Sequence, residues 1–163
     1  MNFNINDRIP DATFNRLGNN GAESVTLYQL IQNRKVILFG LPGAFTPTCS
    51  QDHLPSFIKN VKRFKEKGVD EILCVVVNDV HVAAVWGEQT GATNAGISIL
   101  TDPTSKFVKC LGVGFSVPAL GLYDRFQRFV LVIDKKTIKQ TKVEEVKGAC
   151  DLTTGDHILS ILN

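Results

Sequence analysis

The chain has 163 residues, of which 44% are hydrophobic and 21% are charged, and its formal net charge is +2. This length predicts one globular domain, residues 1–163, which buries about two thirds of the surface that its unfolded chain exposes. The small and dispersed charge argues against a nucleic-acid-binding protein, and no apolar segment approaches the roughly 20 residues that span a membrane. We therefore expect small molecules or proteins as partners.

The N-terminal residues and the cysteines together predict a compartment and a kind of chemistry. Residues 1–7 contain neither a basic leader nor an apolar core, so a cytoplasmic location is expected; a removed transit peptide would leave no trace. The four cysteines are Cys49, Cys74, Cys110 and Cys150, and none forms a Cys-x-x-Cys pair. This scatter fits a reducing compartment in which thiols act as chemical groups, and it predicts no metal site.

The first clear element is the apolar run Lys35–Gly40, whose β-branched and aromatic residues predict a buried strand. A tight turn follows, after which Thr46 is a good N-cap and Pro47 suits the first helical position. Cys49 is then the third helical residue, where unpaired backbone N–H groups and the helix dipole favour an anion. We expect a reactive thiolate at Cys49; the alternative is a small buried hydrophobic residue.

The helix that begins at Pro47 is expected to end near Gly68, and Pro55 predicts a kink over residues 52–54. Further helices are predicted over 82–89, 105–111 and about 156–162, and further strands over 71–79, 97–100, 128–134 and 137–143. The last two strands are joined at Lys135 and Lys136.

The order of these elements predicts an α/β, thioredoxin-like fold, in which helices flank a central mixed β-sheet with an N-terminal extension. Residues 71–79 are apolar on both faces, as expected of a central strand in a covered sheet, so Cys74 should be buried. Cys110 shares a helical run with Phe107 and Leu111, which favours a packing role for it.

Residues 42–50, Pro-Gly-Ala-Phe-Thr-Pro-Thr-Cys-Ser, are followed by His-Leu-Pro at 53–55 and by Val-Asn-Asp at 77–79. This combination closely resembles the atypical peroxiredoxins of the type II or peroxiredoxin-5 subfamily. The resemblance covers nearly the whole chain and includes residues 6–10, Trp86 and residues 125–129. The Pro-x-x-x-Thr-x-x-Cys core is specific because it describes a catalytic geometry as well as a fold.

The resemblance implies a thiol-dependent peroxidase of cell redox homeostasis that reduces hydrogen peroxide and organic hydroperoxides and holds no bound cofactor. Cys49 would be the peroxidatic nucleophile, which attacks the peroxide and becomes a sulfenic acid. Thr46 would accept a hydrogen bond from the peroxide and donate one toward the thiolate. Arg128 would stabilise the thiolate and the leaving oxygen, because its guanidinium stays charged throughout the reaction.

Arg125, three residues earlier, competes with Arg128 for this role, and its other interpretation is a loop-surface charge. We prefer Arg128, because the family's catalytic arginine directly precedes the phenylalanine of this strand. Pro42, Gly43 and Phe45 would shape the substrate pocket, with the proline shielding the thiolate from water, although Phe45 could equally belong to the core.

His53 lies one helical turn after Cys49, and two interpretations of it stay open. It is either an electrostatic helper of the site or a packing and hydrogen-bonded histidine. It also shares a helix face with Cys49, but no third or fourth metal ligand is in view.

The resemblance leaves open which thiol resolves the sulfenic acid. Cys150 ranks first, since it lies in a polar C-terminal loop where animal-type members carry a resolving cysteine. An external thiol, from glutathione, glutaredoxin or thioredoxin, ranks second. Cys74 ranks third; it matches a strand cysteine proposed for plant-type members, but a disulfide requires Cα atoms within about 7 Å, so it would need local unfolding.

Members of the subfamily commonly pair through loops around the active site, so the resemblance also implies a homodimer. Residues 112–120 would contribute to that contact, line the substrate pocket or pack as a loop on their own domain. Two other classes of function fit less well. A disulfide exchanger normally needs a second cysteine near the first, and a cysteine hydrolase needs an oriented histidine base.

Overall fold

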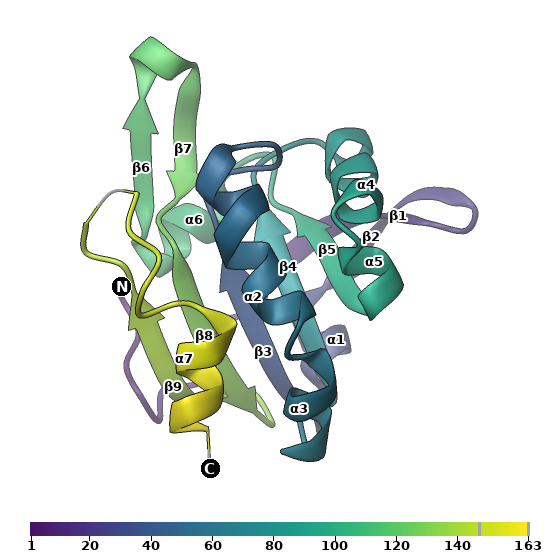
Figure 1. Cartoon of the computed structure of the whole chain (residues 1–163), viewed down its shortest axis with the longest axis vertical. Helices are drawn as coiled ribbons and strands as arrows, with labels where there is room; N and C mark the ends of the chain where they lie inside the picture. Colours follow the sequence, from purple (N-terminus) through teal and green to yellow (C-terminus); the bar gives the residue numbers. More distant parts are fainter. Residues whose placement is uncertain (147, 163) are drawn as a thin grey trace.

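The computed structural model describes residues 1–146 and 148–162, so two positions of the predicted domain, 147 and 163, lie outside the described residues. A mixed sheet of seven strands, in the order β2-β1-β5-β4-β3-β8-β9, forms the centre of this part of the chain (Figure 1). Strands β3, β4 and β5 are parallel to one another, and the other pairs are antiparallel. The strands are β1 (Thr13–Gly18), β2 (Gly21–Thr26), β3 (Lys35–Gly40), β4 (Glu71–Val76), β5 (Ile97–Thr101), β8 (Phe129–Asp134) and β9 (Thr137–Val143).

Helices cover both faces of the sheet, which confirms the predicted α/β arrangement (Figure 1). The helices predicted over 82–89, 105–111 and about 156–162 agree with the observed bounds to within about two residues. The single helix predicted from Pro47 to near Gly68 is divided into three helical elements, and two short helices, over 27–31 and 92–95, were not predicted. The helices are α1 (Leu27–Ile31), the π-helical turn η1 (Cys49–His53), α2 (Leu54–Ile58), α3 (Val61–Glu66), α4 (Val80–Gln89), α5 (Ala92–Ala95), α6 (Lys106–Leu111) and α7 (Gly155–Ile161).

The hydrophobic core lies in two layers because successive side chains of a strand point to opposite faces. On β3, Ile37 and Phe39 belong to the layer under η1, α2, α4 and α7, whereas Val36 and Leu38 belong to the layer that contains α1 and α6. Cys49 and Cys74 are both fully buried in the first layer, so the prediction of a buried Cys74 is confirmed.

The N-terminal extension is the β1–β2 hairpin, which joins the sheet where Asn15 of β1 pairs with Thr101 of β5. Of the three interpretations given for residues 112–120, a loop packed on its own domain is wrong in part. Residues there form β6 (Gly114–Val117) and a short 3-10 turn, η2 (Pro118–Leu120). Strand β6 pairs with β7 (Leu122–Phe126), and the resulting hairpin stands above the sheet (Figure 1).

The packing role expected for Cys110 is also wrong, since its side chain is exposed. Phe107 and Leu111 of the same helix are buried, so α6 turns Cys110 toward the solvent side. Among the described residues, no helix has the length and apolar character needed to cross a membrane.

Candidate active site

Strand β3 ends at Gly40, and this glycine sets how closely the next strand can approach. Gly40 pairs with Phe129 of β8, and a Cβ atom added at residue 40 would clash with the Phe129 ring. The missing side chain therefore lets Phe129 cross β3 and brings the preceding residue, Arg128, to the carboxyl end of the strand.

The turn after β3 is held by one hydrogen bond within the turn and one to a residue that follows β4. The Ala44 N–H donates to Oδ1 of Asn78, which follows β4, at 2.8 Å, and the Thr46 hydroxyl donates to the Gly43 carbonyl at 2.8 Å. The Thr46 carbonyl accepts the first helical hydrogen bond from the Ser50 N–H at 3.1 Å. Helical backbone begins at Pro47, so Cys49 is the third helical residue, as predicted.

The kink predicted from Pro55 takes the form of a π-helical turn over Cys49–His53. The Leu54 N–H donates to the carbonyl of Cys49, five residues back, because the next residue is a proline without an N–H. From α4, the Trp86 indole donates to the Ser50 hydroxyl at 3.0 Å, which fixes the residue after Cys49.

Arg128 lies directly against the Cys49 sulfur although 79 residues separate them in the chain. Its Nη2 is 3.5 Å from Sγ of Cys49, and its Nη1 donates to the carbonyl of Ala149 at 3.3 Å. The side chain is 6% exposed, and its buried Nε has no hydrogen-bond partner among the described residues. The two bonds to Ala149 and Cys49 use two of the five N–H donors of the guanidinium, so Arg128 can also donate to a molecule bound next to the Cys49 sulfur.

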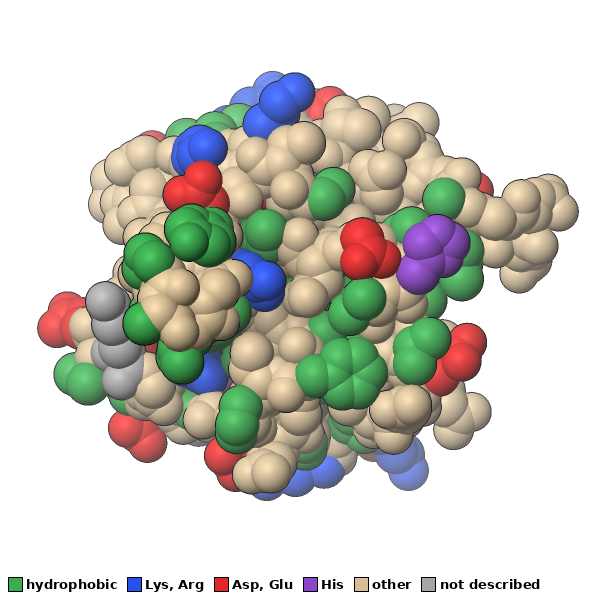
Figure 2. Space-filling model, turned by 90° about the horizontal axis from the view of Figure 1, so that it is seen from above, with side chains coloured by type: hydrophobic (Ala, Val, Ile, Leu, Met, Phe, Trp, Pro, Cys, Tyr) green, Lys and Arg blue, Asp and Glu red, His purple; other side chains and the backbone are tan. Residues whose placement is uncertain are grey.

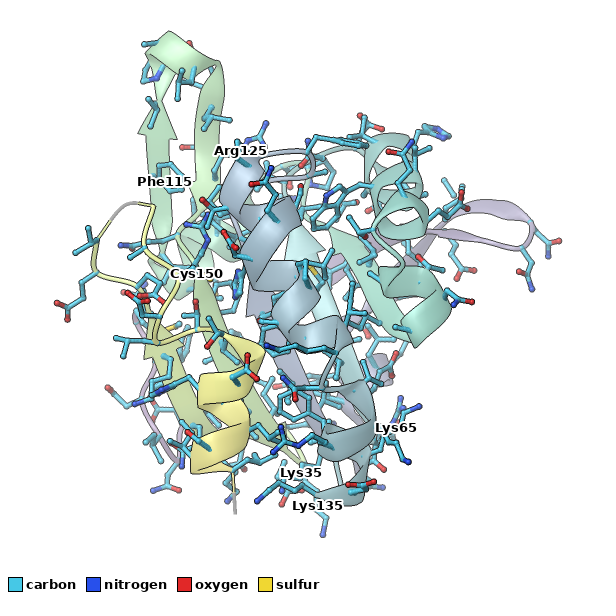
Figure 3. The ribbon with its side chains drawn as sticks, viewed as in Figure 1. Lys35, Lys65, Phe115, Arg125, Lys135 and Cys150 are labelled. Atoms are coloured by element: carbon cyan, nitrogen blue, oxygen red, sulfur yellow. The ribbon has the colours of Figure 1, made fainter. Side chains whose placement is uncertain are left out.

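Arg125 is the second guanidinium of the site, and it is not the loop-surface charge that the sequence allowed. Its Nη1 donates to the carbonyl of Pro42 at 3.0 Å, and a Cβ atom at Gly43 would clash with it. Burial lowers the pKa of Arg125, while the negative charge of a Cys49 thiolate acts in the opposite direction. Arg125 lies beside the beginning of the helix that carries Cys49 (Figure 3).

A cavity of about 230 Å³ opens between the turn, the β6–β7 hairpin and the end of β9. Of the predicted pocket residues, Pro42 lines it together with Thr46 and Arg128, whereas Gly43 lies buried beneath Arg125. Phe45 does not line it and is 53% exposed, so the core interpretation of Phe45 is wrong. The apolar wall comes from the hairpin, with side chains of Phe115, Val117, Leu120 and Leu122.

His53 is fully buried, and its Nε2 lies 2.9 Å from the carbonyl oxygen of Thr153. Burial lowers the pKa of His53 to about 4, so the ring is neutral at neutral pH. Its ring also packs against Phe39 and Phe57. A neutral ring cannot supply positive charge, so the structure favours the packing and hydrogen-bonded interpretation.

The two candidate resolving cysteines have different surroundings. Cys150 is half-buried and lies in the loop before α7, beside the helix that begins with η1 (Figure 3). Burial raises the pKa of its thiol to about 11. Burial also raises the pKa of the Cys74 thiol well above its ordinary value, and the charge of Cys49 adds to this. Both are therefore thiols rather than thiolates in this conformation.

Two contributors to the site were missed in the sequence. Asn78 was noticed only as part of a motif, and no role was assigned to it. Glu144 was not singled out, because nothing distinguishes it in sequence from its neighbour Glu145; only burial does, since Glu144 is 4% exposed and Glu145 is exposed.

Comparison with known proteins shows the family of this chain. The profile of the Redoxin family matches residues 4–159. Peroxiredoxin-2B of Arabidopsis thaliana is 36% identical over 159 residues, which are 97% of each chain, and the rice protein peroxiredoxin-2E-2, chloroplastic, is 38% identical over 162 residues, 97% of this chain and 72% of its own. The chain belongs to the Redoxin family as a type II peroxiredoxin.

A solved structure of reduced Prx3 from Vibrio vulnificus in complex with H2O2 superimposes on this peroxiredoxin with a TM-score of 0.90 at 35% identity, covering 99% of both chains. Peroxiredoxin 5 from Alvinella pompejana gives a TM-score of 0.84 at 28% identity, over 97% of this chain and 96% of its own. The thioredoxin-like peroxiredoxin fold and the thiol-dependent peroxidase activity predicted from the sequence are thereby confirmed. Peroxiredoxins use cysteine thiol chemistry without a bound cofactor.

Proposed function

We propose that Cys49 is the peroxidatic cysteine of this peroxiredoxin. The observation that carries the proposal is the buried Arg128 guanidinium, whose Nη2 lies 3.5 Å from the Cys49 sulfur and which lines the adjacent cavity. The Cys49 thiolate attacks the terminal peroxide oxygen, a sulfur–oxygen bond forms and the oxygen–oxygen bond breaks. The leaving oxygen takes up a proton and departs as water or an alcohol, and Cys49 becomes a sulfenic acid.

Thr46 and Arg128, which line the same cavity, act on different atoms of the peroxide. The Thr46 hydroxyl donates to Gly43, so its oxygen lone pairs can accept the hydrogen bond of the peroxide O–H. Donation to the thiolate, which the family resemblance implies, requires this hydroxyl to rotate. Arg128 donates to the oxygen on which negative charge develops, and its guanidinium is itself buried, which strengthens this interaction.

The substrates are hydrogen peroxide and organic hydroperoxides. The cavity beside Thr46 and Arg128 has polar groups at the reacting end and an apolar wall from the β6–β7 hairpin. Such a cavity holds a small apolar group next to the reacting oxygens, and it also admits hydrogen peroxide.

The sulfenic acid is returned to the thiolate in two steps. The Cys150 thiol condenses with the Cys49 sulfenic acid, forming a disulfide and releasing one water, and an external thiol then reduces the disulfide. Glutathione, glutaredoxin or thioredoxin supplies that thiol. Cys150 is preferred to Cys74 because it is half-buried at the surface, whereas Cys74 is fully buried in the centre of the sheet.

A homodimer and a cytoplasmic location belong to the same proposal. Four large hydrophobic side chains are more than half exposed, namely Phe45, Leu120, Tyr123 and Val146. Figure 2 shows hydrophobic side chains on the projecting hairpin and on the surface beside it. A second copy covering this surface would shield it from water.

Peroxide consumption by single-cysteine variants tests the proposal. Cys49→Ser should lose the activity under every reductant. Cys150→Ser should keep the first turnover and, with glutathione supplied, continue to consume peroxide. Activity of Cys49→Ser equal to that of the natural chain would end the proposal.

A further inference from the structure

A short stretch of chain before α7 crosses the site and contacts Arg128. We call residues 148–154 the C-terminal segment. Its Ala149 carbonyl accepts a hydrogen bond from Arg128, and its Gly148 lines the cavity. Cys150 lies in the same segment (Figure 3). Whatever holds this segment in place therefore affects both the arginine and the candidate resolving thiol.

Glu144, directly after β9, holds the segment with its buried carboxylate. Its Oε1 accepts three hydrogen bonds, from the Asp151 N–H at 2.7 Å, the Thr153 N–H at 2.9 Å and the Thr153 hydroxyl at 2.9 Å. The side chain is 4% exposed and forms no salt bridge within the described part of the chain. A buried carboxylate without a paired cation depends on such hydrogen bonds, so these contacts are strong.

The ionisation of Glu144 agrees with this geometry. Burial alone would raise its pKa, but the hydrogen bonds from Thr153, Asp151 and Leu152 outweigh burial, and the pKa is lowered. The carboxylate is therefore ionised at neutral pH, the state in which it is the strongest acceptor.

Glu144 is also connected to both catalytic elements. Its own N–H donates to the carbonyl of Arg128 at 2.9 Å. On the other side, Thr153 bonds through its carbonyl to His53, which lies one turn after Cys49. Glu144 thus joins Arg128 through its backbone and the C-terminal segment through its side chain, and the segment is joined to the helix of Cys49 through Thr153.

We propose that Glu144 is a positioning residue of this peroxidase, which holds the Ala149 carbonyl against Arg128 during attack on the peroxide and releases the segment before Cys150 meets Cys49. Cys150 precedes Asp151, whose N–H is bound to Glu144, so that bond restrains the backbone next to Cys150. The inference rests on the proposed function of Cys49 and Cys150. The released state permits the condensation Cys49–SOH + Cys150–SH, which gives the disulfide and one water.

Glu144→Gln tests the proposal, because it keeps the shape of the side chain and removes its charge. Glu145→Gln is the matched control, since it removes the same charge from the exposed neighbour. The Glu144 charge also raises the pKa of the Cys150 thiol, so alkylation by iodoacetamide is followed as a function of pH in a Cys49→Ser background to obtain the rate constant of the Cys150 thiolate itself. That rate constant should be about fivefold greater with Glu144→Gln than with Glu145→Gln, because an uncharged acceptor holds the segment less tightly. Peptide masses would report each cysteine, and the buried Cys74 should react as in the natural chain.

The second measurement is the rate of peroxide reduction by the reduced protein with Cys49 intact. Glu144→Gln should lower this rate about threefold or more, because Arg128 is no longer held by Ala149, and Glu145→Gln should leave it unchanged. Slower peroxide reduction together with faster Cys150 labelling is the expected pair. General destabilisation would instead raise labelling of Cys74 as well.

Equal Cys150 labelling in the two glutamine variants would overturn the proposal. So would faster labelling with an unchanged peroxide rate, because Glu144 would then hold the segment without positioning Arg128. Should Glu144→Gln fail to fold, Thr153→Val removes one of the three donors and should give a smaller change in the same directions. Labelling does not require Cys49, so a failure of the proposed peroxidatic role would leave this arm informative.

Discussion

Two arginines, Arg125 and Arg128, lie at the site, and their contacts indicate different roles. Arg128 donates to the Cys49 sulfur and lines the cavity beside it, whereas Arg125 donates to the Pro42 carbonyl and packs on Gly43. Arg128 can therefore act on reacting atoms. Arg125 instead holds the turn that precedes Thr46, and acts on the reaction through the position of that turn.

We predict that Arg128→Lys lowers the rate constant for peroxide reduction by about 100-fold. A lysine lacks the planar guanidinium that donates to the Cys49 sulfur and to the Ala149 carbonyl at the same time. Arg125→Lys, the matched change, should lower the same rate constant by about tenfold, because it loosens the turn. Stopped-flow mixing of reduced protein with peroxide measures both. A greater loss from Arg125→Lys would reverse the assignment.

The buried histidine predicts how stability depends on pH. The pKa of His53 is about 4 in the folded chain, below the ordinary value of 6.5, so the unfolded chain takes up the proton first. The stabilisation from the neutral ring is complete above pH 6.5 and is lost as the pH falls toward 4, by up to about 3 kcal/mol.

Urea unfolding at pH 7 and pH 4.5 should show this loss in the natural chain and a smaller one in His53→Leu, although His53→Leu is less stable at pH 7. His81→Asn, at an exposed position, is the control and should follow the natural chain. Identical pH dependence in His53→Leu would show that another group is responsible.

At the scale of elements, the apolar runs predicted most of the sheet, because burial on both faces leaves an unmistakable pattern in β3 and β4. The β6–β7 hairpin escaped prediction because most of its side chains are exposed or half-buried and only Phe126 of its two strands is fully buried, so no apolar run marks it. The π-helical turn at Cys49 was expected only as a kink, since Pro55 reveals a missing donor but not how the helix rearranges around it.

The β8–β9 turn was correctly placed at Lys135 and Lys136, but the backbone there is unfavourable for lysine. Both residues have positive φ, 49° and 71°, a conformation that suits asparagine and glycine in two-residue hairpins. Lys135 lies exposed at the end of the molecule opposite the projecting hairpin (Figure 3).

Lys135→Asn should therefore raise the free energy of unfolding by about 0.5–1 kcal/mol. The Lys135 N–H, which donates to Arg34, is kept by the substitution. Lys139→Asn, at an exposed position within β9, removes the same charge and should give no gain. Chemical denaturation compares the two; a gain for Lys139→Asn alone would contradict the explanation from φ.

At the scale of the whole molecule, the family motif predicted Cys49, Thr46 and Arg128 together, and folding brings these distant residues to one place. The same reasoning could not find Glu144 or Asn78, because their roles depend on which backbone N–H groups the fold places beside them. Nor could it place Phe45, whose exposure depends on a positive φ of 62° in the turn.

The proposed dimer predicts that sedimentation at low micromolar concentration gives a species of twice 17.9 kDa. Leu120→Asp, at a position 72% exposed, should shift it toward the monomer by placing a charge in the contact. Leu17→Asp, on the distant β1–β2 hairpin and 45% exposed, is the control. A natural chain that sediments only at 17.9 kDa would refute the stable dimer.

The most direct test of Cys49 as the peroxidatic residue is intact-mass analysis with peptide mapping after a single equivalent of hydrogen peroxide without reductant. We predict that the natural chain loses two hydrogens and that mapping joins the Cys49 and Cys150 peptides, while Cys150→Ser gains oxygen on Cys49. A Cys49 peptide that stays unmodified while peroxide is consumed would contradict the assignment.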